Sequence, residues 1–249
     1  MIFKVLTVFL LLSTVFVNTN AEYLYATDVA GNISVSQLNC IRSNGYSAIF
    51  TQIYSNNGYV DLTGFQNVIS AYLAGLGTEV YISPYSINSP TFFEFDQIYK
   101  QFNSSNIHVR TIWLKVADSS IWARNPSFNI DFIKKIVTWA RLYGITIGIY
   151  TNWYDWDRIT GSTTTFQKYN LPLWYWNAYG YGPSAEGTAD FSDFRSFGNW
   201  KSASAKEYGL KENLCSATIS KIVYQKSASF LKFKSYKNMT QPVAGSAIF

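Results

Sequence analysis

The chain has 249 residues, of which 48% are hydrophobic, 18% aromatic and 14% charged. This composition is too apolar for a disordered chain, and the chain is too long for a small disulfide scaffold. Twenty basic and 15 acidic residues give a formal charge of +5 that is spread thinly, so no nucleic-acid-binding arm is indicated. Two cysteines and one histidine are too few for a zinc site, and we expect no metal.

Residues 1–21 are predicted to be a secretory signal peptide. Lys4 precedes the apolar run Val5–Val17, and small residues around Ala21 suit cleavage. The run is short for a membrane span, and no second apolar segment approaches the required length. We therefore expect a secreted protein without a membrane span. Three glycosylation sequons give this compartment weak support, at Asn32, Asn103 and Asn238.

Short β-rich runs alternate with helix-like segments along the rest of the chain, a pattern typical of a parallel sheet. The predicted helices span 35–43, 62–73, 92–102 and 127–143, and residues 153–157 also have helical spacing. The predicted strands span 23–29, 46–54, 79–83, 109–116, 145–151, 171–176, 203–208 and 219–224.

Five βα units followed by strands with little helix predict an α/β fold, an irregular single-domain (β/α) barrel of TIM type. We place the barrel at residues 22–224. Residues 225–249 contain four lysines and are predicted to be a basic, poorly ordered C-terminal extension.

The two cysteines, Cys40 and Cys215, are expected to pair in an oxidising compartment. The bond would close a loop of about 175 residues and would restrict the unfolded chain. The alternative is two separately buried thiols.

Functional groups of such barrels project from the carboxyl ends of the strands. The predicted strand ends bring together the carboxylate of Asp28 and the rings of Tyr150, Trp174 and Tyr175. Aromatic rings cover the apolar faces of sugars, and polar groups bind their hydroxyls. The strand ends therefore predict a sugar-binding cleft, although aromatic residues also fill barrel interiors.

Several short motifs occur along the chain in a characteristic order. They are YATDV at 25–29, SNGY at 43–46, IWL at 112–114, GITIGIYT at 144–151, LPLWY at 171–175, FSDF at 191–194, FGNW at 197–200 and NLC at 213–215. In these motifs the sequence resembles the lysozymes of glycoside hydrolase family 25, particularly the secreted, nematode-like animal branch. The resemblance covers roughly residues 22–224. It implies an irregular (β/α) barrel, cleavage of muramyl–glucosamine bonds in bacterial peptidoglycan, and no metal or cofactor. Cys40 and Cys215 match cysteines of that branch, which implies that a bond joins the first helix to the closing segment of the barrel.

The sequence departs from that family at the positions that carry catalysis. The family's Asp-x-Glu on the fourth strand, whose Glu is the proton donor, matches Lys115 and Ala117 here. A further Asp position on the last strand matches Ser220, and Asp28 is the clearly retained acid. Glycoside hydrolysis requires a proton donor beside a second reactive group, and alanine has no proton to donate. Lys115 beside Asp28 would lower the pKa of that carboxyl, whereas a general acid needs a raised one.

The leading hypothesis is a secreted lysozyme-like protein, hydrolytically impaired or inactive, that binds peptidoglycan or a related glycan in innate defence or digestion. In this reading Asp28 either contacts the ligand or holds a hydrogen-bond network with Lys115. One alternative is an active hydrolase that uses Asp28 with a relocated carboxylate such as Asp118. This needs a bulge or an early strand end, because a shift of one residue reverses the side-chain direction. The other alternative is a secreted interaction protein that binds no glycan.

Overall fold

The structure is a computed structural model that describes residues 23–29, 31–55, 57–84, 90–225 and 240–248. The predicted signal peptide lies outside the described residues, as does the sequon at Asn238. Among the helices that are described, none combines the length and the apolar character needed to cross a membrane.

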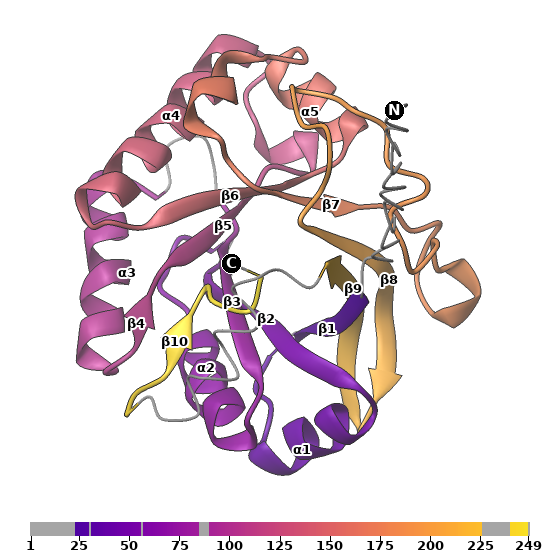
Figure 1. The fold of residues 1–249 in the computed structure, drawn as a ribbon. Coiled ribbons are helices and arrows are strands. Elements are labelled where there is room, and N and C mark those ends of the chain that lie inside the picture. Colours follow the sequence, from indigo (N-terminus) through magenta and orange to yellow (C-terminus); the bar gives the residue numbers. More distant parts are fainter. Residues whose placement is uncertain (1–22, 30, 56, 85–89, 226–239, 249) are drawn as a thin grey trace, which may run out of the picture.

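The strands close into a barrel (Figure 1). Their spatial order is β2, β1, β9, β8, β7, β6, β5 and β3, and β3 pairs back to β2. Their bounds are β1 (Tyr23–Val29), β2 (Tyr46–Tyr54), β3 (Gly77–Ile82), β5 (Thr111–Lys115), β6 (Thr146–Thr151), β7 (Leu173–Trp176), β8 (Ala205–Leu214) and β9 (Ala217–Gln225). All neighbours are parallel except β9, which runs antiparallel to both β1 and β8. The predicted irregular (β/α) barrel is confirmed.

Five helices lie outside the barrel, as Figure 1 shows, and they follow β1, β2, β3, β5 and β6 in that order. Their bounds are α1 (Val35–Ser43), α2 (Leu62–Ala74), α3 (Phe92–Ser104), α4 (Pro126–Leu142) and α5 (Trp153–Thr160). Local chemistry fixes their ends. Ser34 caps α1 and Thr91 caps α3, each in a capping box that satisfies backbone amides at the first turn. Gly75 ends α2 at φ 72°, a conformation that glycine adopts without steric cost.

Large aromatic side chains fill the barrel interior. Phe50, Trp113 and Trp174 have no exposed surface, and their ring centroids lie 4.4–6.4 Å apart. A separate, mainly aliphatic core fills the space between the barrel and α2 to α5. Because inward and outward residues alternate along a strand, these two cores fix which side chains face the barrel interior.

The disulfide between Cys40 and Cys215 forms, with the two Cα atoms 5.9 Å apart. It joins α1 to the turn between β8 and β9. The expected pairing is therefore confirmed, and the alternative of two separate thiols is excluded.

Part of the C-terminal segment packs into the barrel, which differs from the poorly ordered extension expected for 225–249. Gln225 ends β9, and residues 226–239 and 249 lie outside the described residues. Strand β10 (Val243–Ala244) pairs with β3 and with β4 (His108–Val109). The Arg110 amide donates to the Ala244 carbonyl, which accounts for the interruption of the single strand predicted at 109–116.

Glu79 anchors this segment at the amino-terminal end of the barrel. One carboxyl oxygen accepts hydrogen bonds from the amides of Ala247 and Ile248 at 2.8 and 3.1 Å, and the other accepts from Trp113 Nε1 at 2.8 Å. The Glu79 side chain is fully buried. Burial raises its pKa to about 7, against the smaller opposing effect of these hydrogen bonds.

Glu79 is expected to make the protein more stable in acid than at neutral pH. Because its pKa rises from 4.5 when exposed to about 7 when folded, its stabilisation is complete below pH 4.5 and is lost as the pH rises to 7. The loss amounts to about 3 kcal/mol. We expect Glu79→Gln to reduce the pH dependence of the free energy of unfolding by this amount, measured by urea unfolding between pH 4.5 and 8. Asp131→Asn, at an exposed carboxyl, is the control, and equal slopes for Glu79→Gln and the unmodified protein would contradict the assignment.

Candidate functional site

The carboxyl ends of the parallel strands bring Asp28 and Lys115 together. Asp28 is next to last in β1, and Lys115 is the last residue of β5. The register places Lys115 beside Tyr150, and Tyr150 beside Trp174. These side chains form one level at the mouth of the barrel.

The Lys115 ammonium lies within an aromatic cage at this level. Its Nζ is 4.3 Å from the ring centroid of Tyr81, 4.8 Å from that of Tyr150 and 5.7 Å from that of Trp174. Its distance to Asp28 Oδ2 is 3.7 Å, and the Tyr81 hydroxyl donates to the same oxygen at 3.2 Å. The cation is therefore held by ring faces and by a carboxylate together.

The electrostatics of Asp28 differ from the sequence-based expectation. The Lys115 charge and the Tyr81 hydrogen bond lower the pKa of Asp28, as predicted. Burial acts in the opposite direction and is the larger effect, so the pKa is raised overall. The residue as a whole is only 9% exposed, which explains why desolvation dominates.

Glu207 is a second carboxyl of this site and is not among the site residues predicted from the sequence. It lies in β8, where its Oε2 accepts a hydrogen bond from the Tyr150 hydroxyl. Burial, together with the nearby Asp28 charge, raises its pKa to about 7, although Lys115 opposes this shift. Alternation along β8 puts Glu207 on the same face as Ala205, which contributes to the interior core, but the adjacent Lys206 is charged as well, so hydropathy does not single out that face.

Ala117 and Asp118 lie beyond the end of β5. Ala117 packs against the interior aromatic core. Asp118 is exposed, has φ 57° and accepts hydrogen bonds from the Ser120 amide and hydroxyl. Its side chain therefore caps a short 3₁₀ helix (Ser119–Ile121), and the described contacts do not bring it to Asp28.

The three rings predicted to stack on sugars are all buried and face two directions. Tyr150 and Trp174 belong to the barrel interior, at 7% and 0% exposure. Tyr175 packs on the other face of β7 against Phe194 and Phe197. The structure therefore brings Tyr150 and Trp174 to Asp28 and Lys115, and it separates Tyr175 from them.

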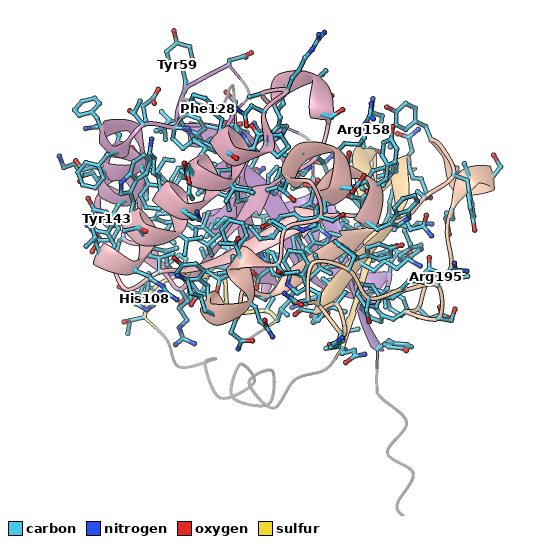
Figure 2. All side chains as sticks on the ribbon, turned by 90° about the horizontal axis from the view of Figure 1, so that it is seen from above. Tyr59, His108, Phe128, Tyr143, Arg158 and Arg195 are labelled. Carbon is cyan, nitrogen blue, oxygen red and sulfur yellow. A yellow bond between two sulfur atoms is a disulfide. The ribbon has the colours of Figure 1, made fainter. Side chains whose placement is uncertain are left out.

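Other aromatic side chains are exposed beyond the strand ends. Tyr59 follows β2 and is 74% exposed, and Phe128, near the start of α4, is 62% exposed. Figure 2 shows both at one end of the molecule, with His108 at the other end. Of the predicted glycosylation positions, Asn32 and Asn103 are exposed.

Comparisons with known proteins agree with this architecture. A family model described as Lysozyme-like protein 1 matches residues 19–208. Lysozyme-like protein 1 of Caenorhabditis elegans is 38% identical over 211 residues, covering 84% of this chain and 70% of that protein. The chain belongs to the lysozyme-like protein family.

More distant relatives extend this family relationship. Probable GH family 25 lysozyme 2 of Dictyostelium discoideum is 26% identical over 189 residues, covering 76% of this lysozyme-like chain and 84% of that protein. A family GH25 lysozyme from Aspergillus fumigatus superposes with a TM-score of 0.63 at 15% identity, covering 85% of this chain and 99% of that chain. At this low identity, the second comparison shows a shared fold.

The Lys115–Asp28 pair is expected to show energetic coupling in this lysozyme-like barrel. Lys115→Met removes the cation and leaves a buried carboxyl without it, so we expect a loss of about 1–3 kcal/mol in the free energy of unfolding at pH 7. Adding Asp28→Asn should recover part of this loss, as measured by a double-mutant cycle in urea. The exposed Lys134–Asp131 pair, at 3.2 Å, is the matched control, and its coupling should be below about 0.5 kcal/mol. Additive effects at positions 28 and 115 would contradict the proposed coupling.

Proposed function

We propose that this chain is a secreted lysozyme-like protein that binds peptidoglycan or a related glycan at the barrel mouth without hydrolysing it. The observation that carries the proposal is the Lys115 ammonium, 3.7 Å from the retained carboxyl of Asp28. In the related lysozymes, the resemblance implies an acidic residue at the Lys115 position. The cation therefore occupies the place of a group that hydrolysis would use.

The chemistry of glycoside cleavage supports the loss of activity. One carboxyl must donate a proton to the leaving oxygen while a second group acts at the anomeric carbon. At the position that matches the family's proton donor, Ala117 has no ionisable group. Loss of general acid catalysis alone lowers a rate by about 10²–10⁴-fold.

Secretion is supported by the predicted signal peptide and by the Cys40–Cys215 disulfide, because such bonds persist mainly in oxidising compartments. Membership of the lysozyme-like family supports the proposal of a role in innate defence or digestion. In this proposal, glycan binding is what remains of the ancestral activity, and peptidoglycan is the partner.

A second candidate function is residual hydrolysis, and Glu207 is the observation that favours it. A buried carboxyl with a pKa of about 7, near a second carboxyl, has the properties of a general acid. In this reading Glu207, rather than Asp118, is the relocated carboxylate that works with Asp28. The Lys115 charge opposes this role because it lowers the pKa of both carboxyls.

The main test is the release of reducing ends from insoluble peptidoglycan, together with co-sedimentation of the protein. We expect the unmodified protein to sediment with peptidoglycan and to release no reducing ends. The double variant Lys115→Asp/Ala117→Glu restores the family's acidic pair, so we expect it to gain measurable release. Release of reducing ends by the unmodified protein would overturn the proposal. Absence of both binding and release would favour the alternative of a secreted interaction protein that binds no glycan.

Glu207→Gln separates the two candidate functions. If residual hydrolysis depends on this carboxyl, any release by the unmodified protein should fall by about 10²-fold or more in this variant, because glutamine cannot donate the proton. Asp118→Asn is the matched control and should leave the rate unchanged. Equal release by the unmodified protein and by Glu207→Gln would exclude Glu207 as the acid.

A further inference from the structure

We propose that Lys115 makes the barrel mouth selective for glycans that carry carboxylates over neutral glycans. The inference rests on the proposed glycan binding and names the chemical class of the ligand. The recognising group is the Lys115 ammonium, and the recognised group is a carboxylate on the sugar or on an attached peptide.

The Lys115 ammonium keeps donors that it does not use within the protein. A lysine ammonium has three N–H donors and no acceptor. Among the described residues it contacts three ring faces and the Asp28 oxygen at 3.7 Å, a distance at which any hydrogen bond to that oxygen is weak. The side chain is 24% exposed, whereas that of Asp28 is 11% exposed. The more accessible partner of the pair is therefore the cation.

Two residues that contact the ammonium each have a buried polar atom that lacks an ordinary hydrogen bond. Asp28 Oδ1 and Trp174 Nε1 have no hydrogen-bond partner of normal geometry among the described residues. The Val29 amide affects the carboxyl of Asp28 only weakly, as the smallest of the influences on its pKa. Buried polar groups are usually satisfied, so their clustering here is typical of a site prepared for a polar ligand.

The charge balance at the mouth permits an anion when Glu207 is protonated. The charged and titratable groups around Lys115 are Asp28 from β1, Tyr81 from β3, Tyr150 from β6 and Glu207 from β8, and the Asp155 carboxyl of α5 acts on Tyr150. Burial raises the pKa of both Asp28 and Glu207, and protonation of either carboxyl removes a negative charge that competes with an anionic ligand for Lys115. Ionisation of both carboxyls leaves more negative charge than Lys115 balances, and this repels the ligand. Anionic binding should therefore weaken as the pH rises through about 7, where Glu207 loses its proton.

Electrostatic attraction over the whole surface is the competing explanation. The full chain has a formal charge of +5, which would attract any anionic polymer. A surface effect responds to the removal of any exposed lysine, whereas recognition at the mouth depends on Lys115. Lys100→Gln is therefore the matched control, because Lys100 lies on α3 with its side chain 62% exposed, in a pair with Asp96.

The experiment compares co-sedimentation of the full chain at pH 6 with three insoluble glycans. These are peptidoglycan freed of phosphate polymers, the same material with its carboxyls amidated, and chitin, which is neutral. We expect the unmodified protein to bind native peptidoglycan about tenfold more tightly than the amidated form, the effect of one charge-assisted hydrogen bond. Lys115→Gln should bind both forms equally, and Lys100→Gln should keep the preference. Lys115→Arg keeps the charge and should keep the preference, which tests the proposal if Lys115→Gln fails to fold.

The outcomes separate this proposal from the proposed function. Equal binding of native and amidated peptidoglycan by the unmodified protein would overturn the selectivity and leave glycan binding intact. Equal weakening by Lys100→Gln and Lys115→Gln would assign the preference to surface charge and overturn it also. Peptidoglycan stripped of stem peptides by an amidase distinguishes a carboxylate on the sugar from one on the attached peptide, because it keeps only the carboxylates on the sugars. A retained preference there assigns recognition to the sugar, and a lost preference assigns it to the peptide.

Discussion

The enclosure of the Lys115 ammonium at the carboxyl ends of the barrel strands determines the chemistry of this barrel. Lys115 Nζ lies within 5.7 Å of three ring centroids and 3.7 Å from a carboxylate. The rings form the top of the interior core, so the position of the cation depends on the packing of Tyr81, Tyr150 and Trp174. Removal of the charge would leave Asp28 buried among aromatic side chains, which is costly for an ionised group.

Carboxyl groups at the two ends of the barrel interior are accommodated in different ways. At the amino-terminal end, Glu79 is satisfied by N–H donors from Trp113 and the C-terminal segment. At the mouth, Glu207 accepts from the Tyr150 hydroxyl, and the Lys115 charge lowers its pKa. Burial raises the pKa of both carboxyls to about 7. The barrel interior therefore favours protonated carboxyls, and its stability and charge both depend on pH near neutrality.

The sequence was sufficient to predict the barrel because its elements follow local rules. A β-rich run and a stretch of helical spacing placed β1 and α1 at their observed bounds. The insertion of β10 between β3 and β4 was not predictable in this way, because it joins Val243 and Ala244 to residues more than 130 positions earlier. At the site, strand ends predicted the Asp28–Lys115 pair. Glu207 was missed because Lys206, its neighbour on the opposite face of β8, is also fully buried, so hydropathy in this strand does not mark one face as the interior.

The same cation that suits an anionic ligand opposes glycoside hydrolysis. The transition state of that reaction resembles an oxocarbenium ion and develops positive charge at the anomeric carbon. A carboxylate near this carbon stabilises the developing positive charge. The Lys115 ammonium, 3.7 Å from the Asp28 carboxylate, repels that positive charge and also neutralises the carboxylate. Rate acceleration requires interactions that strengthen in the transition state, whereas Lys115 would favour the bound ground state of an anionic glycan. Exchange of an acid for lysine at this strand end therefore changes the sign of the charge that the mouth stabilises, which separates binding from catalysis without a change of fold.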